Sequence, residues 1–381
     1  MIELKSVLQD DFWIMPATPK YEINGIPYIT SKNIKNGKID FQNANYISVD
    51  DYYKISKKRP IKENDILISM IGTLGETAIV TNEDGIFYGQ NMFLVRLNQK
   101  KIYNQYFMYY FKSNFVKRQL HTKQNKSTQS YLKAGHIESL KINLPSYKTQ
   151  KEVVKKLDKI VCILNKYKIQ IDMLDELVKA RFVELFGDPV YNEKQWKVEQ
   201  FGSLGELKRG KSKHRPRNDP ILLGGKYPLI QTGDISNSHT YIQTYKSTYS
   251  EEGLKQSKMW KAGTLCITIA ANIAESAILT FDACFPDSIV GFLPNDKVNL
   301  IFIHHWLDFL QPILEENAPA VAQKNLNVAT LEKVGVILPP LELQNQFADF
   351  VKEVDKSRLE VQKSLKKTQE LFDSLMQKYF G

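Results

Sequence analysis

Apolar side chains recur at alternating steps of four and three within residues 147–187, in the middle of the chain. These positions are Val153, Leu157, Ile160, Leu164, Tyr167, Ile171, Leu174, Val178 and Leu185. The spacing places one apolar stripe, interrupted by Arg181, on a single long helix, and it is typical of a coiled coil. Pro145 blocks helix before it, and Gly187 with Pro189 ends it. At ~1.5 Å per residue, a helix of about 36–38 residues within this segment would span about 55 Å, which exceeds what one compact domain needs and predicts a spacer.

The same segment occurs a second time at the end of the chain, in residues 341–381. Pro339 repeats Pro145, and Gln344 repeats Gln150 at the same offset. The stripe returns as Phe347, Val351, Val354, Arg358, Val361, Leu365, Thr368, Phe372, Leu375 and Tyr379. Because a long helix with one apolar stripe needs a partner, we expect the two copies to form an antiparallel coiled coil, its register fixed by the polar positions. Two independent surface helices are the alternative, which their length disfavours.

The segments before the two helices, residues 1–146 and 188–340, predict two globular α+β domains in tandem repeat. In the first, apolar runs at 65–71, 77–80 and 92–97 predict strands, and the aromatic-rich run 103–120 predicts one helix. The second domain matches this series through Tyr227–Ile235 for Ile26–Ile34, Trp260–Ile269 for Ile61–Met70, and 301–314 for the aromatic helix. The apolar cores agree while the polar loops differ. We therefore expect two scaffolds of one type that carry different surfaces.

Composition adds one unusual feature, a strongly basic balance. The 381 residues, 43% hydrophobic and 25% charged, are ordinary for a two-domain folded protein. The net charge of +10 and the pI near 9.1 favour a polyanionic partner. Three cysteines, Cys162, Cys266 and Cys284, show no metal spacing and suit a reducing cytoplasm, and the six histidines show none either. With no signal-peptide run or membrane-length apolar stretch, we expect a soluble cytoplasmic protein without a metal.

Two variable halves, each followed by a long helix that ends in Phe-Gly, resemble the specificity subunit of type I restriction–modification systems. The supporting motifs are Asp65-Ile66-Leu67-Ile68 with Gly72 and Gly75, the glutamine segments at 129 and 323, and the helix entry Leu338-Pro339-Pro340-Leu341. Ala271 stands where the first half has Gly72, and Ser146 interrupts the doubled proline at the first helix entry. The resemblance implies that each half is a target-recognition domain for one half of a split DNA sequence. It also implies that the helices hold these domains apart and dock the modification subunits.

Catalytic chemistry is not expected of this chain. Residues 205–212 satisfy the phosphate-loop pattern GxxxxGK[ST], but Pro216 and Pro220 follow in a charged stretch that cannot easily start the required helix. We interpret the match as accidental. The resemblance implies that methylation with S-adenosylmethionine and ATP- and Mg-dependent restriction belong to partner subunits, two methyltransferase subunits and one restriction subunit, so the chain has no cofactor of its own.

Binding chemistry concentrates in polar loops. Six cations fall within residues 208–217. Taken alone, this run is as typical of a solvated loop as of a loop that contacts phosphates, and the resemblance favours phosphate contact. Glutamine, asparagine, arginine and lysine side chains can pair with base edges, although a turn or cap role competes for each. The candidate DNA-binding residues are Lys32, Asn33, Lys57, Lys58, Arg59, Asn125, Lys126, Gln129, Lys208, Arg209, Lys211, Lys213, Arg215, Arg217, Gln231, Thr232, Gln323, Lys324 and Asn325.

The predicted function is sequence-specific recognition of a bipartite duplex DNA target. One alternative is a non-catalytic coiled-coil scaffold whose basic charge is incidental. The other is an ATPase built on residues 205–212, for which nucleotide binding by the purified chain would be the test.

Overall fold

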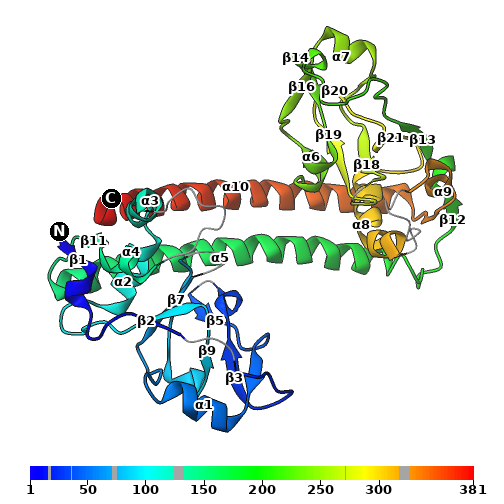
Figure 1. The fold of residues 1–381 in the computed structure, drawn as a ribbon. Coiled ribbons are helices and arrows are strands. Elements are labelled where there is room, and N and C mark those ends of the chain that lie inside the picture. Colours follow the sequence, from blue (N-terminus) through cyan, green and yellow to red (C-terminus); the bar gives the residue numbers. More distant parts are fainter. Residues whose placement is uncertain (16–18, 36, 71–74, 124–132, 271, 317–325) are drawn as a thin grey trace. The chain divides into compact units, whose positions relative to one another are not determined.

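The fold is that of a computed structural model, which describes residues 1–15, 19–35, 37–70, 75–123, 133–270, 272–316 and 326–381 (Figure 1). The chain divides into two compact units. The first unit comprises Met1–Tyr167 with Ser364–Gly381, and the second comprises Lys168–Lys363. Within the described residues, no helix is sufficiently long and apolar for a membrane span.

The first unit is built on a four-stranded sheet with the order β2-β10-β7-β8 and a three-stranded sheet with the order β6-β3-β9. Its strands are β1 (Ile2–Glu3), β2 (Trp13–Ile14), β3 (Ile26–Ile29), β4 (Ile34–Lys35), β5 (Lys38–Ile39), β6 (Asn45–Ile47), β7 (Ile66–Ser69), β8 (Thr77–Ile79), β9 (Tyr88–Gly89), β10 (Met92–Val95) and β11 (Lys141–Ile142). Its shorter helices are α1 (Val49–Ser56), α2 (Asn104–Lys112), α3 (Asn114–Lys123) and α4 (Ala134–Glu138). The strands expected at 65–71, 77–80 and 92–97 are β7, β8 and β10, and every residue of β7 and β10 is buried.

The single helix expected over 103–120 is wrong, because the structure contains two helices, α2 and α3, with Ser113 between them. Ser113 has extended backbone angles, φ −68° and ψ 154°, and its backbone N–H donates to Tyr110 O. Its hydroxyl accepts from the backbone N–H of Val116 at 3.3 Å, as a cap residue does at the start of a helix. Of the aromatic residues of α2, Tyr106, Phe107, Tyr110 and Phe111 are buried in the core. Tyr109, which the sequence also suggests for the core, is only half-buried, and its hydroxyl donates to Asp158.

The second unit repeats this plan. Its five-stranded sheet has the order β13-β21-β18-β19-β15, and its four-stranded sheet has the order β16-β14-β20-β17. The strands are β12 (Val198–Gln200), β13 (Gly205–Arg209), β14 (Leu223–Leu229), β15 (Tyr241–Ile242), β16 (Ser247–Tyr249), β17 (Met259–Trp260), β18 (Leu265–Thr268), β19 (Ser276–Leu279), β20 (Ala283–Cys284), β21 (Ile289–Pro294) and β22 (Gly335–Ile337). The shorter helices are α6 (Thr232–Ser236), α7 (Glu251–Lys255), α8 (Leu300–Glu316) and α9 (Val328–Glu332), of which α8 packs on β19 (Figure 1). Equivalent strands pair in parallel in both units, β3 with β9 in the first and β14 with β20 in the second, so the strand plan is duplicated.

Two helices of 40 residues, α5 (Tyr147–Phe186) and α10 (Leu341–Phe380), begin at the residues expected and end one residue before the expected boundaries. Within the second unit they run antiparallel, because Phe182 contacts Phe347 while Asp175 contacts Arg358. Most of the expected stripe on α5 is buried, but its end differs. Phe182 and Phe186 are fully buried there, and Leu185 is only partly buried. An apolar stripe with a 3.5-residue period drifts on a straight helix of 3.6 residues per turn, which accounts for this change of face.

Candidate nucleic-acid interface

The basic run 208–217 starts on a strand and leaves it at Gly210. Lys208 and Arg209 are the last residues of β13, which pairs antiparallel with β21. Gly210 is buried where a β-carbon would collide with the backbone oxygens of Phe285 and Pro286. Residues 210–219 then form neither helix nor strand. The run is therefore a loop anchored at one end by a sheet.

The arginines of this run all contact one residue, Asp287, two through its carboxylate and one through its backbone oxygen. Arg217 pairs with Asp287 Oδ1, Arg215 Nη2 lies 3.4 Å from Asp287 Oδ2, and Arg209 Nε donates to the backbone oxygen of Asp287. Arg215 also donates from Nη1 to the backbone oxygens of Ser212 and His214, at 2.7 and 2.8 Å. These contacts fix the course of the loop, and the single carboxylate of Asp287 compensates part of the charge of Arg215 and Arg217.

The lysines are in a different situation. Lys208 pairs with Glu206, whereas Lys211 and Lys213 are exposed and have no side-chain partner among the residues that the structure describes. Beside them lies Lys258, which was not among the candidates from the sequence. Its ammonium lies 3.9 Å from the ring centroid of Trp260, and burial, followed by the charges of Lys208 and Lys211, lowers the pKa of Lys258. The available signal was the two-residue spacing from Lys258 to Trp260, which puts both side chains on one face of an extended segment.

The turns after the equivalent strands β3 and β14 are closed by the same kind of hydrogen bond. The backbone N–H of Thr30 donates to Asn33 Oδ1 at 2.8 Å, and that of Gln231 donates to Asp234 Oδ2 at 2.9 Å. Asn33 is buried, and its Nδ2 also donates to the backbone oxygens of Asp40 and Asn43. Asn33 therefore has a role in forming the turn, which is the alternative to base contact that the sequence leaves open for the polar candidates. Lys32 and Gln231 are exposed and Thr232 is half-buried, and their DNA contacts stay predictions.

The second basic group, Lys57, Lys58 and Arg59, follows α1. Both lysines are exposed, while the Arg59 side chain is 12% exposed and lies 3.7 Å from Asp10. Asp10 in turn contacts Arg96, and Arg96 makes two hydrogen bonds of 2.7 Å to the buried carboxylate of Asp65. Arg59 therefore belongs to an internal ion-pair network, whereas Lys57 and Lys58 have no ion-pair partner among the residues that the structure describes.

Six candidate residues lie outside the described part of the chain: Asn125, Lys126, Gln129, Gln323, Lys324 and Asn325. The phosphate-loop pattern at 205–212 can be assessed. It covers strand β13 and the first residues of the loop, and no helix follows within the described residues 210–219. A phosphate-binding loop requires a helix N-terminus at this place, so the geometry agrees with an accidental match and removes the basis of the ATPase alternative.

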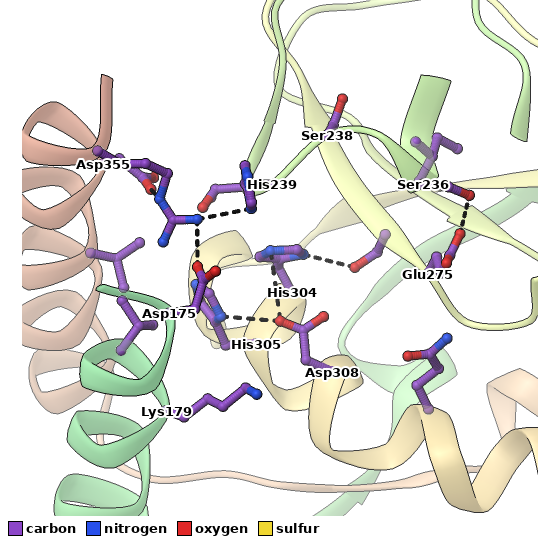
Figure 2. A pocket seen from close by; sticks show the side chains of 17 residues that line it. Asp175, Lys179, Ser236, Ser238, His239, Glu275, His304, His305, Asp308 and Asp355 are labelled. Atoms are coloured by element: carbon purple, nitrogen blue, oxygen red, sulfur yellow. Dashed lines mark hydrogen bonds and ion pairs between the residues drawn. The ribbon is translucent and has the colours of Figure 1, made fainter. Parts of the chain in front are cut away.

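A cavity of about 380 Å³ in the second unit contains a polar cluster from α5, α8 and α10 (Figure 2). On α8, potential ligand atoms of His304, His305 and Asp308 lie within 4.8 Å of one another. Asp308 Oδ2 lies 3.2 Å from His305 Nδ1 and 3.9 Å from His304 Nε2, and His304 Nδ1 is 2.9 Å from Ser276 Oγ. Burial lowers the pKa of His304 to about 4. These contacts are those of a polar network within the unit, which the histidine spacing did not reveal, and the absence of a bound metal stays a prediction.

On the other wall of this cavity, Arg358 of α10 joins three elements. The side chain is buried, its Nη1 lies 2.5 Å from Asp175 Oδ1 of α5, and it donates to Nδ1 of His239 at 2.8 Å (Figure 2). His239 must accept this bond with an unprotonated Nδ1, and burial together with the Arg358 charge lowers its pKa. The polar position in the stripe therefore pairs the two helices and also reaches the loop before β15.

Comparison with known proteins decides what this doubled fold is. The family model described as "Type I restriction modification DNA specificity domain" matches the chain twice, at residues 14–172 and 193–371. The chain belongs to this family. Each match covers the main sheets of one unit and more than half of the long helix that follows them, so the family domain occurs twice, in agreement with the duplication that the sequence predicts. The interpretation of the chain as a specificity subunit is therefore confirmed, and the alternative of a coiled-coil scaffold with incidental basic charge is not supported.

Relatives of the specificity family match along nearly the whole chain. A putative type I restriction enzyme MjaX specificity subunit of Methanocaldococcus jannaschii is 25% identical over 97% of this chain and 91% of its own length. The EcoBI specificity subunit of Escherichia coli is 20% identical over 94% of this chain and 80% of its own length. A type I restriction–modification S subunit from M. genitalium has a similar fold, with a TM-score of 0.56 at 15% identity, over 100% of this chain and 95% of that one. A chain from a structure titled for complex assembly and conformational transition of the type I R-M system gives 0.57 at 16% identity, over 100% and 96%.

Proposed function

We propose that the chain recognises a bipartite DNA target, one half through the domain of residues 1–146 and the other through that of residues 188–340. The observation that carries this proposal is the duplicated strand plan with different loops. The second domain has the basic loop 208–217 after β13, whereas the segment after β2 in the first domain lacks such a run of cations. Two similar scaffolds with different surfaces suit two different half-sites.

The two long helices are proposed to continue as one antiparallel coiled coil that carries both domains and binds the partner subunits. An exposed apolar stripe on α5 supports a docking role: Ile169, Met173 and Leu177 are 57%, 66% and 47% exposed at four-residue intervals. Such a stripe on a charged helix is typical of a protein-binding face. The partners are proposed to be two methyltransferase subunits and a restriction subunit, as the resemblance to the specificity subunits of type I restriction–modification systems implies.

The chemistry is assigned to those partners. In this proposal the chain has no active site, the methyltransferase subunits use S-adenosylmethionine to methylate adenine, the restriction subunit uses ATP and Mg, and the assembly works in the cytoplasm. The contribution of this chain is to select the DNA sequence.

Exchange of one domain tests the proposal. Residues 1–146 are replaced by the equivalent segment of a relative, the complex is assembled with its methyltransferase subunits, and exposed DNA is sequenced for methylation. One half of the methylated sequence should change and the other half should stay. A folded, active chimera that changes both halves, or neither, contradicts separate recognition by the two domains.

A further inference from the structure

The basic loop of the second domain separates into two kinds of cation. The three arginines, Arg209, Arg215 and Arg217, all contact Asp287 and so hold the loop in place. The lysines Lys211 and Lys213 lie on the same loop without a carboxylate partner among the described residues. The arginines therefore have a structural role in the loop, and Lys211 and Lys213 are the loop cations that no described carboxylate pairs.

A second segment, residues 256–260, is fastened to this loop. Gln256 Oε1 accepts from the backbone N–H of Lys213 at 2.6 Å and from that of His214 at 3.2 Å. The hydroxyl of Ser257 donates to the backbone oxygen of Lys211 at 3.0 Å. These bonds make the loop and the segment one surface, and the segment adds Lys258 to it.

Lys258 is held in place without being neutralised. Its ammonium lies 3.9 Å from the centroid of Trp260, which is buried and stacks on Phe285 at 4.7 Å. An aromatic face attracts the cation and fixes its position but leaves its donors free. No described carboxylate pairs with Lys258, and the charges that act on its pKa are those of the cations Lys208 and Lys211, which repel it. The ammonium groups of Lys208, Lys211 and Lys258 thus have one carboxylate among them, that of Glu206. Binding of an anion would reduce their mutual repulsion.

We infer that Lys258, positioned by Trp260, forms a phosphate-binding surface with Lys211 and Lys213 that contacts the DNA backbone beside the half-site of the second domain. This inference rests on the proposed function. Phosphate contacts orient a protein on the duplex without selecting bases, and each contact adds close to one counterion to the salt dependence of binding. Lys258 therefore contributes affinity for all sequences, and Gln256 acts as a positioning residue that keeps the two segments together.

The test uses the full chain assembled with its partner subunits and a duplex of about 30 base pairs of arbitrary sequence, titrated at several salt concentrations. Lys258→Met keeps the aliphatic stem over Trp260 and removes the charge. Removal of one phosphate contact should lower the log–log salt slope by about one unit, so the decrease in affinity between about 50 and about 200 mM salt becomes about 3.5-fold smaller. Lys258→Arg should restore the slope, and Lys211→Ala should lower it as Lys258→Met does.

Lys261 supplies the matched control. It lies three residues further on in the same domain, is exposed, and pairs with Asp282 at 2.7 Å. Lys261→Met should leave the slope unchanged, and thermal unfolding of each variant checks that the domain stays folded. An unchanged slope for Lys258→Met alongside a lowered slope for Lys211→Ala would remove Lys258 from the surface. Unchanged slopes for both, in a complex that still methylates its target, would overturn the phosphate surface and leave the proposed function standing. A complex that binds no duplex at any salt would overturn the proposed function itself.

Discussion

Gln150 and Gln344 occupy the same position in the two halves of the chain and make the same set of hydrogen bonds. Gln150 Oε1 accepts from the backbone N–H of Tyr103 at 2.8 Å, and its Nε2 donates to the backbone oxygens of Lys101 and Pro145. Gln344 Oε1 accepts from the backbone N–H of Asn299 at 2.9 Å, and its Nε2 donates to the backbone oxygens of Lys297 and Pro339. Both side chains are fully buried. Each glutamine thus ties the start of a long helix to the loop before α2 or α8.

Replacing either glutamine by leucine should destabilise its own unit. Gln150→Leu leaves three backbone groups without their partner, and unsatisfied buried groups cost about 1–3 kcal/mol each before relaxation. Hydrogen exchange gives a local readout: the Tyr103 amide should lose protection in Gln150→Leu, and the Asn299 amide in Gln344→Leu. Gln170→Leu, on an exposed position of α5, should change neither. Retained protection at Tyr103 in Gln150→Leu would show that the fold does not depend on this bond.

The glutamine pair also indicates how far sequence alone could go. Prolines 145 and 339, the repeated glutamine and the periodic stripe mark the helix starts, because these signals are local or periodic. The pairing of Arg217 with Asp287 joins positions far apart in the sequence, and nothing in the spacing indicates it. The position of Lys258 beside the basic loop likewise depends on how β17 and β20 pair. Tertiary contacts of this kind decide which cations are free, so the sequence could predict the basic loop but not which residues in it are structural.

Substitutions of Arg358 and Asp175 should have strongly coupled effects on the free energy of unfolding. Asp175→Asn removes a partner of a buried guanidinium, and an incompletely paired buried charge is costly. Arg358→Leu removes that charge. In the Arg358→Leu background, Asp175→Asn should therefore lower the free energy of unfolding by less than it does in the wild type, with a coupling energy of about 1–3 kcal/mol. Unfolding in urea followed by tryptophan fluorescence measures it, because Trp196, Trp260 and Trp306 all belong to the second unit. The exposed pair Lys179 and Glu176 should give a coupling near zero. Additive effects of Asp175→Asn and Arg358→Leu would contradict a register-fixing contact.

Stability of the second unit should fall in mildly acidic solution because of His304. Its pKa is lowered from 6.5 to about 4, first by burial, while Asp308 opposes the shift and His305 and His239 add to it. The folded state therefore binds fewer protons than the unfolded state between these values, so the stability is complete above about pH 6.5 and is lost as the pH falls towards 4. The charged or titratable groups around the cavity are Asp175, Lys179, His239, Glu275, His305, Asp308, Asp355 and Arg358.

The variant His304→Asn isolates this contribution, because its amide can still reach Ser276 but does not titrate. Between about pH 7.5 and about pH 5 the wild type should lose about 2 kcal/mol more unfolding free energy than the variant. The measurement is urea unfolding at both pH values with tryptophan fluorescence. His121→Asn, at an exposed position of α3, should follow the wild type. Equal losses in wild type and His304→Asn would mean that His304 stays accessible to protons in the folded unit.

The length of the proposed coiled coil should set the gap between the two recognised blocks. Because Asp175 lies opposite Arg358 and Phe182 opposite Phe347, the same antiparallel count in a continuous pair places Tyr167 near Ser364. One heptad inserted after Tyr167 and one after Lys363 keeps the stripe in register. The addition lengthens the pair by ~10 Å, which equals about three base pairs at ~3.4 Å each.

Methylated DNA from cells that express this variant with its partner subunits should show the same two blocks with an unread gap longer by about three base pairs. Activity should be lower, because those base pairs rotate the second half-site by roughly 100° at ~10.5 base pairs per turn, while the heptads hardly rotate the helices. The control carries the heptad in α5 alone, which shifts one stripe against the other and should abolish specific methylation. An active double insertion with an unchanged gap, or with altered blocks, would show that the helices do not measure the distance between the half-sites.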